Sequence, residues 1–296
     1  MKCETTCGDL MNENYRIGAL TIHAQMEHPV VGSAVADQFR CQEKGRLICH
    51  HRVAEVLQPS TKAELIYKEE ALEVYRTAVG LETVRYAHLP IPHPYMISIE
   101  HFDGRQVDIV RCAADLSWSS QVSYFWRAMS LRHCLINAGN LLLRAGYVNV
   151  GGKGILFAGS AAMEQVMLWG KVPGTVIVNQ DRCAIGVEDG KAMAFAVPLL
   201  GRGQICRKED LPLEAVVLAD YGKSNSLSAI SGPKAMAAMR PFVACDAWRD
   251  GKHAVALSLL GDVLGKVSVM EMKCSSGEAS VKELAAALGL KVKRKR

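Results

Sequence analysis

The chain has 296 residues, of which 49% are hydrophobic and 22% are charged, a composition typical of globular proteins. No apolar run approaches the ~18–20 residues of a membrane-spanning helix, and the polar start MKCETTCGDLMNENYR gives no expectation of a signal peptide. The formal net charge of +5 comes from the last six residues, KVKRKR, because removing their five basic side chains leaves 30 basic residues against 30 acidic ones. The basic tail is expected to be a solvated, disordered end, with a weak contact to an anion or nucleic acid as the alternative. No nucleic-acid partner is expected, because the tryptophans are not surrounded by basic residues.

The ten cysteines are scattered along the chain and form no C-x-x-C pair. We expect reduced thiols in a cytoplasmic protein, several of them packed as small apolar groups. A metal or redox pair at Cys3 and Cys7 is the alternative, but a structural metal site needs further ligands nearby. No metal site is therefore predicted.

The first part of the chain is predicted to be a β-rich α+β region over residues 15–125, after a disordered stretch at residues 1–14. A first strand is expected over Tyr15–Ala24, and the apolar residues of 63–81 have helical spacing. The dipeptide Asp103-Gly104 predicts a hairpin turn between two strands. Adjacent His50 and His51 on a strand would point to opposite faces, so they cannot easily bind one metal.

From residue 126 to residue 290 the pattern alternates between strands and helices, which indicates an α/β core with a mixed sheet. A helix is predicted over residues 123–140, followed by two strands around a glycine-rich turn, a helix over 161–169, a strand over 175–178 and a hairpin that turns at residues 189–190. A buried strand, LEAVVLADYG, a helical piece at 234–239, a longer helix, a last strand, SVMEMKC, and a final helix follow. Residues 291–296 form a basic tail.

The central stretch, GGKGILFAGSAAMEQVMLWGKVPGTVIVNQDR, has the order strand, loop, helix and a second strand with an acidic end. This is the order of a phosphate-binding loop, which requires glycines, a lysine for the outer phosphates and a hydroxyl for Mg²⁺. Here the strand GILFAG is followed by SAAMEQV, which supplies neither the lysine nor the hydroxyl at the helix start.

The segments RAGYV, GGKGILFAG, LWGK, TVIVNQDRCAI, DGKAMAFAVPLLGRGQI and PLEAVVLADYGKSN occur in an order that resembles P-loop proteins related to HPr kinase and PEP carboxykinase. The resemblance covers about residues 131–290 and is greatest to small bacterial members often found beside peptide-modification genes. It implies a mixed-sheet P-loop core that binds a nucleotide at the loop.

Compared with that family, the loop is degenerate. Arg144 stands where the family has a histidine, and Ala162 stands near the position of the lysine. The vestigial loop consists of Gly159, Ser160, Ala161, Ala162, Met163 and Glu164. Asp181 and Arg182 match the acidic strand end, whose aspartate helps to hold Mg²⁺ or to activate the attacking hydroxyl in active members; an internal salt bridge or a turn is the other interpretation.

Three basic side chains are candidates for contact with an anion. Arg202 lies between two glycines, so it either contacts an anion or is a surface side chain of a loop. Lys153 and Arg144 both precede the strand, and neither is expected to reach the loop.

We therefore expect no tight ATP binding and no cofactor. The expected function is that of a catalytically degenerate binding or regulatory subunit, with a protein or peptide partner implied by the resemblance alone. The alternatives are an active kinase of a peptide or small molecule, which would use ATP, Mg²⁺ and Asp181, and a cysteine-based metal or redox protein.

Overall fold

The computed structural model describes residues 10–28, 33–60, 62–87, 92–119, 122–199, 205–249, 251–275 and 279–290. The chain forms two compact units, one made of Met1–Arg16 and Leu20–Cys134 and the other of Ile17–Ala19 and Leu135–Arg296. The second unit thus takes Ile17–Ala19 from within the first part of the chain and continues from Leu135.

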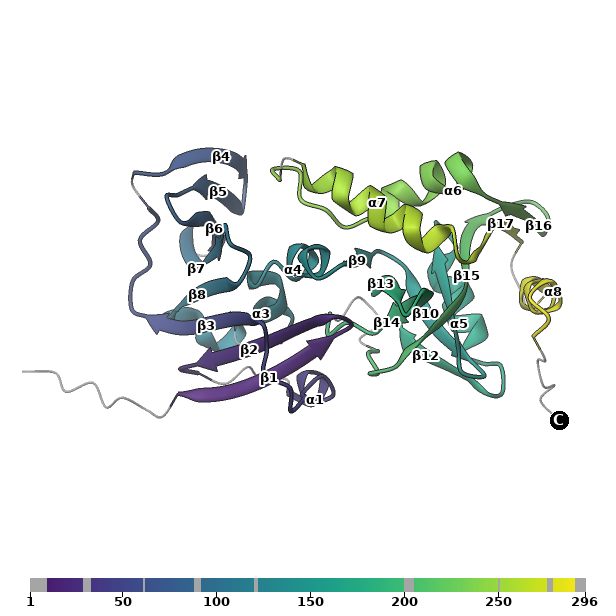
Figure 1. Ribbon diagram of the computed structural model, residues 1–296, viewed down its shortest axis with the longest axis horizontal. Coiled ribbons are helices and arrows are strands. Elements are labelled where there is room, and N and C mark those ends of the chain that lie inside the picture. Colours follow the sequence, from purple (N-terminus) through teal and green to yellow (C-terminus); the bar gives the residue numbers. More distant parts are fainter. Residues whose placement is uncertain are drawn as a thin grey trace, which may run out of the picture. The chain divides into compact units, whose positions relative to one another are not determined.

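The first unit is built on an eight-stranded mixed sheet with the order β1-β2-β3-β8-β7-β6-β5-β4 (Figure 1). Strand β3 pairs in parallel with β2 and with β8, and the strands from β8 to β4 pair in antiparallel succession. The strands are β1 (Met11–Ile17), β2 (Leu20–Met26), β3 (Leu47–Ala54), β4 (Glu64–Glu69), β5 (Leu72–Arg76), β6 (Gly80–Ala87), β7 (His93–His101) and β8 (Gln106–Cys112).

Short helices accompany this sheet: α1 (Ser33–Asp37), η1 (Ala113–Asp115), α2 (Leu116–Ser119) and α3 (Val122–Ala128). Helix α4 (Leu131–Asn137) crosses from the first unit into the second after Cys134. Trp126 of α3 is fully buried and packs edge-on against Tyr15 of β1, with ring centroids 5.2 Å apart. On β3 the two histidines point to opposite faces, as expected from strand geometry. His51 is 1% exposed, and burial lowers its pKa to about 3, whereas His50 is partly exposed and bonds to Asp108 at 3.0 Å.

Several local predictions for this unit were wrong. Residues 63–81 do not form a helix, because β4 and β5 fold into a hairpin across Glu70-Ala71 and β6 begins at Gly80. The expected first strand is two strands, β1 and β2, that turn at Gly18, which has a φ of 56°. Strand β1 begins at Met11, inside the stretch predicted to be disordered; residues 1–9 lie outside the described residues.

The helix predicted over residues 123–140 is also interrupted. It is divided into α3 and α4 by Ser130, whose φ of 51° is left-handed and cannot continue an α-helix. The chain then enters a strand at Asn140, the last residue of the predicted helix. The hairpin at Asp103-Gly104 is confirmed, since β7 and β8 pair antiparallel on either side of it.

The second unit contains a nine-stranded mixed sheet. Its main path has the order β12-β10-β11-β15-β14-β13-β9, while β17 pairs with β15 and β16 pairs with β17. The strands are β9 (Asn140–Leu143), β10 (Gly146–Val150), β11 (Lys153–Ala158), β12 (Thr175–Asn179), β13 (Cys183–Glu188), β14 (Lys191–Phe195), β15 (Asp210–Tyr221), β16 (Ser226–Ile230) and β17 (Ser268–Cys274). The β13–β14 turn has positive φ at Asp189 and Gly190, the geometry of a two-residue hairpin.

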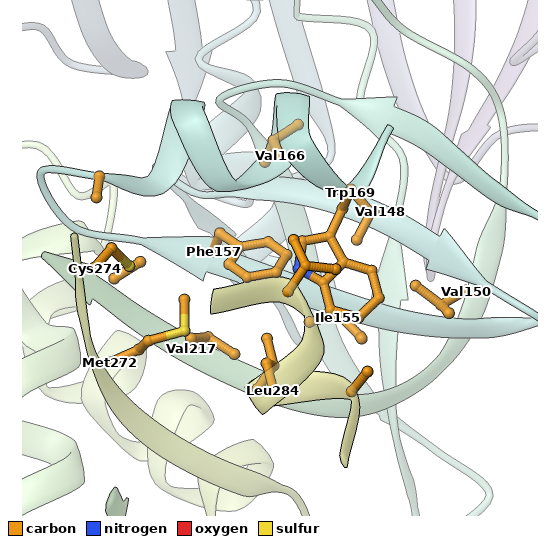
Figure 2. Packing of buried hydrophobic residues seen from close by; sticks show 14 residues of the cluster. Val148, Val150, Ile155, Phe157, Val166, Trp169, Val217, Met272, Cys274 and Leu284 are labelled. Carbon is orange, nitrogen blue, oxygen red and sulfur yellow. The ribbon is translucent and has the colours of Figure 1, made fainter. Parts of the chain in front are cut away.

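The helices of this unit are α5 (Ala162–Trp169), α6 (Gly232–Met239), η2 (Arg240–Phe242), α7 (Lys252–Leu264) and α8 (Ala279–Ala287). Figure 2 shows the core in which α5 and α8 meet the sheet, with Phe157 of β11 beside Trp169 of α5 and Leu284 of α8 close by. The Phe157 and Trp169 rings lie 6.2 Å apart, and Trp169 is fully buried. A buried hydrogen bond from the Ser280 hydroxyl to Gln165 also joins α8 to α5.

From β10 to α8 the expected elements occur in the expected order, except that strand β16 between β15 and α6 was not predicted, and both sheets are mixed. The protein therefore has the α/β character expected from its sequence.

Candidate functional site

The candidate site lies where several strands of the second unit end at the same edge of the sheet. Strand β15 pairs in parallel with β11 and with β17. Strand β12 runs in the same direction, because both β11 and β12 are antiparallel to β10. The carboxyl ends of these four strands therefore share one edge, which is the usual place for a ligand in an open α/β sheet.

The connection from β11 to α5 consists of Gly159, Ser160 and Ala161. Gly159 has a φ of 111°, and a Cβ atom there would lie 2.3 Å from the carbonyl oxygen of Ala219. Only glycine fits this position, because the backbone of β15 passes too close for any side chain. The glycine expected in the loop is thus required by the approach of β15.

Ser160 is bonded to the end of β15. Its backbone N–H and its hydroxyl both donate to one carboxylate oxygen of Asp220, at 3.0 Å and 2.8 Å. The Tyr221 N–H donates back to the Ser160 hydroxyl at 3.3 Å. The Ser160 amide of the loop is therefore hydrogen-bonded to a carboxylate of the protein itself.

The next two amides of the connection are also used. The Ala161 N–H donates to the carbonyl oxygen of Ala219 at 2.9 Å, and the Ala162 N–H donates to that of Gly159 at 3.4 Å. A phosphate-binding loop works because successive backbone N–H groups point at the anion. In this chain the amides of Ser160, Ala161 and Ala162 are all directed to protein oxygen atoms.

The electrostatic environment at this edge of the sheet stabilises the ionised carboxylate of Asp220. The Ser160 backbone N–H is the main cause of the lowered pKa of Asp220, and Lys273 of β17, 3.4 Å away, lowers it further. Glu164 adds a second acidic side chain in the first turn of α5. Negative charge at a helix N-terminus is stabilising, and here the protein supplies that charge itself.

Asp181 and Arg182 follow β12 at the same edge, in a turn organised by Asn179. The buried Asn179 side chain accepts the N–H groups of Asp181 and Arg182 at 3.1 Å and 3.0 Å. The Arg182 guanidinium donates to the Asp181 backbone carbonyl at 3.3 Å. Within the described residues the Oδ1 atom of Asp181 is buried without a hydrogen-bond partner, which is costly for a carboxylate.

Arg144 and Lys153 lie at opposite edges of the sheet. Lys153 is the first residue of β11 and pairs with Glu214 at 2.9 Å, away from the loop. Arg144 precedes β10, and because β10 runs antiparallel to β11, the start of β10 lies at the edge where β11 ends. The expectation from chain order overlooked this reversal. The Arg144 guanidinium donates to the carbonyl of Pro241.

The sequence analysis also missed Asp220 and Lys273. The signal for Asp220 was present, since an acidic residue directly follows a buried apolar run in LEAVVLAD. What the sequence did not show is that this strand pairs with β11, which brings Asp220 to Ser160 across 60 positions. Arg202, Cys3 and Cys7 and the basic tail lie outside the described residues.

The described cysteines show no sign of a metal centre. Among the residues that the structure describes, no group of three or more His, Cys, Asp or Glu side chains could hold a metal ion. Burial raises the pKa of the Cys206 thiol to about 12 and that of Cys274 to about 11. Thiols of this kind are poor nucleophiles. Cys274 packs as an apolar group in the hydrophobic core, and the Cys206 thiol donates to the carbonyl of Val197 at 3.1 Å.

No protein-family model and no curated protein sequence matches this chain. Among solved structures, the HPr(Ser) kinase/phosphatase from Coxiella burnetii is similar to it with a TM-score of 0.29 and 8% sequence identity. The match covers 50% of this chain and 98% of that one. This likeness is too distant to assign a function.

In the described part of the chain, no helix has the length and apolar character needed to cross a membrane.

Proposed function

We propose that this protein is a catalytically degenerate relative of the HPr kinase-like P-loop proteins that acts as a cytoplasmic binding or regulatory subunit for a protein or peptide partner. The observation that carries the proposal is the bonding of Ser160 to Asp220. A nucleotide would have to displace this carboxylate, which is held by two hydrogen bonds and by Lys273, to reach the loop amides.

Two features of the loop add to this obstacle. Phosphoryl transfer depends on positioning and on neutralising the charge of the phosphates. The connection offers Ala162 near the place of the phosphate-binding lysine, and Met163 and Glu164 where hydroxyl groups would hold Mg²⁺. Glu164 would also repel a triphosphate, so the loop lacks both the cation and the Mg²⁺ ligand that a nucleotide needs.

A titration of the purified protein with a fluorescent ATP analogue and Mg²⁺ tests this proposal. We expect no saturable binding at micromolar nucleotide and no shift in melting temperature with Mg²⁺-ATP. Micromolar affinity would overturn the proposal. A protein with an intact phosphate-binding loop, titrated in the same buffer, controls for the activity of the nucleotide.

A second candidate is an active kinase that uses Asp181 as its base, and one observation favours it. The buried Asp181 Oδ1 atom, which lacks a partner among the described residues, is the kind of costly group that is retained at functional sites. Asp181→Asn separates the two candidates. It abolishes ATP turnover if the kinase candidate holds, and leaves partner binding unchanged if the degenerate subunit holds.

A further inference from the structure

The first unit ends in a strand that has a strand neighbour on one side only among the described residues. Strand β4 pairs with β5 and is the last strand of the sheet order, as Figure 1 shows. Its side chains are mostly exposed, including Leu65, of which 47% is accessible. An edge strand of this kind is a template for pairing with another chain.

A hollow of about 380 Å³ lies at the end of β4, and its lining is acidic. It is bounded by Lys68, Glu69, Glu70, Glu73, Tyr86 and Pro92. The Glu73 carboxylate accepts hydrogen bonds from Lys68 at 2.7 Å and from the Tyr86 hydroxyl at 2.6 Å. The ammonium group of Lys68 is thus paired with Glu73. The Glu69 carboxylate accepts a hydrogen bond from the neutral Tyr67 hydroxyl, so no cation among the lining residues neutralises the charges of Glu69 and Glu70.

The charges of β4 argue against a second copy of this chain as the neighbour. If two copies paired antiparallel along the whole of β4, Glu64 of one copy would lie opposite Glu69 of the other. Like charges directly opposite each other destabilise a strand pair. A strand that carries positive charge would avoid this repulsion and would complement the hollow.

We propose that the edge of β4 binds an extended basic peptide segment, which adds to the sheet as a further strand and places a lysine or arginine side chain at the acidic hollow. Backbone pairing supplies affinity in this mode of recognition, and alternate side chains supply selectivity. Leu65 offers an apolar contact to a neighbouring side chain of the peptide. The inference rests on the proposed function, because it names the chemistry of the peptide partner.

The test measures fluorescence anisotropy with three labelled peptides on the full-length protein. In the first, lysine alternates with valine; in the second, glutamate replaces lysine; in the third, proline replaces valine. We expect the lysine–valine peptide to bind, with an affinity that falls as salt increases. The glutamate peptide should not bind, and the lysine–proline peptide should bind at least about tenfold more weakly, because proline lacks the N–H donor needed for strand pairing.

Charge reversal on the protein gives the matched comparison. The double variant Glu69→Lys/Glu70→Lys should bind the lysine–valine peptide at least about tenfold more weakly. The control Glu188→Lys/Glu283→Lys changes the net charge equally in the second unit and should bind like the parent. Circular dichroism checks that both variants are folded.

Three results would overturn the inference: equal binding by the Glu69/Glu70 variant, an equal loss in the control variant, or equal binding of the lysine–proline peptide. The outcome is independent of the nucleotide titration. Tight nucleotide binding would refute the degenerate loop and leave these peptide ratios unchanged, whereas failure of the peptide test would leave the loop argument intact.

Discussion

Asp220 accepts two hydrogen bonds from Ser160, one from the backbone N–H at 3.0 Å and one from the hydroxyl at 2.8 Å. The two residues are 60 positions apart in the sequence and meet because β11 and β15 are parallel neighbours. The short connection between β11 and α5 is thus hydrogen-bonded to β15 through the Asp220 carboxylate. These hydrogen bonds occupy the Ser160 amide, which a bound phosphate would need.

Removal of the Ser160 hydroxyl should weaken the contact between Ser160 and Asp220 without abolishing it. Ser160→Ala loses one of the two bonds to Asp220 and keeps the backbone bond, so we expect a loss of about 1 kcal/mol in the free energy of unfolding. Urea denaturation measures it. Ser117→Ala, at an exposed position of α2, is the control and should change little. An unchanged stability of Ser160→Ala would mean that the hydroxyl bond to Asp220 contributes nothing.

The close approach of β15 to Gly159 can be separated from the effect of backbone conformation. Gly159→Ala and Gly174→Ala both place an alanine at positive φ, 111° and 85°, which costs about 1–2 kcal/mol. Only at Gly159 does the new Cβ meet a backbone oxygen, at 2.3 Å; at Gly174 no described atom lies within 4 Å. Thermal unfolding should show Gly159→Ala to be less stable than Gly174→Ala by at least about 1–3 kcal/mol. Equal losses would contradict this packing.

How much of this site the sequence reveals depends on the range of the contacts. The β13–β14 hairpin is predictable because Asp189-Gly190 is a local turn signal, and the strand–loop–helix at Gly159 follows from local apolar patterning. The pairing of Ser160 with Asp220 is not predictable in this way, because no local pattern states which strands become neighbours. Residues 63–81 mislead because their apolar residues fit helical spacing while pairing with β6 selects strands.

Arg144 is a second case in which the linear sequence does not show which residues become neighbours. Its place before β10 suggests distance from the loop in the linear sequence. The hairpin at Gly151 and Gly152, both with positive φ, reverses the chain and returns the end of β11 to the edge where β10 begins. Chain order alone therefore cannot decide which cations lie near the loop.

Acid should destabilise the first unit through Glu73. The hydrogen bond from Lys68 is the main cause that lowers the pKa of Glu73 to about 2, with further bonds from Tyr75 and Tyr86. A carboxylate with a lowered pKa in the folded state contributes stability above its unfolded pKa of about 4.5, and this contribution is lost as the pH falls toward about 2. Glu73→Gln should flatten the fall in stability over that range. Glu283→Gln is the control, and an identical slope in Glu73→Gln and the parent would contradict the assignment.

The packing of α8 should be essential for the core of the second unit. Leu284 is fully buried in the cluster around Phe157 and Trp169. Leu284→Ala should therefore lower the free energy of unfolding by about 2–5 kcal/mol, as measured by chemical denaturation. Leu227, which lies at the margin of the same cluster and is partly buried, provides the comparison, since its truncation should cost less. If both variants lost the same amount, α8 would not close this core.

The resonance of the Ser160 backbone amide, followed by NMR during a titration with Mg²⁺-ATP, tests the central claim most directly. If Asp220 holds this amide against nucleotide, the resonance stays in place as nucleotide is raised to millimolar concentration. A shift of the Ser160 resonance that saturates at micromolar nucleotide would show that the loop still binds phosphate and would contradict the account.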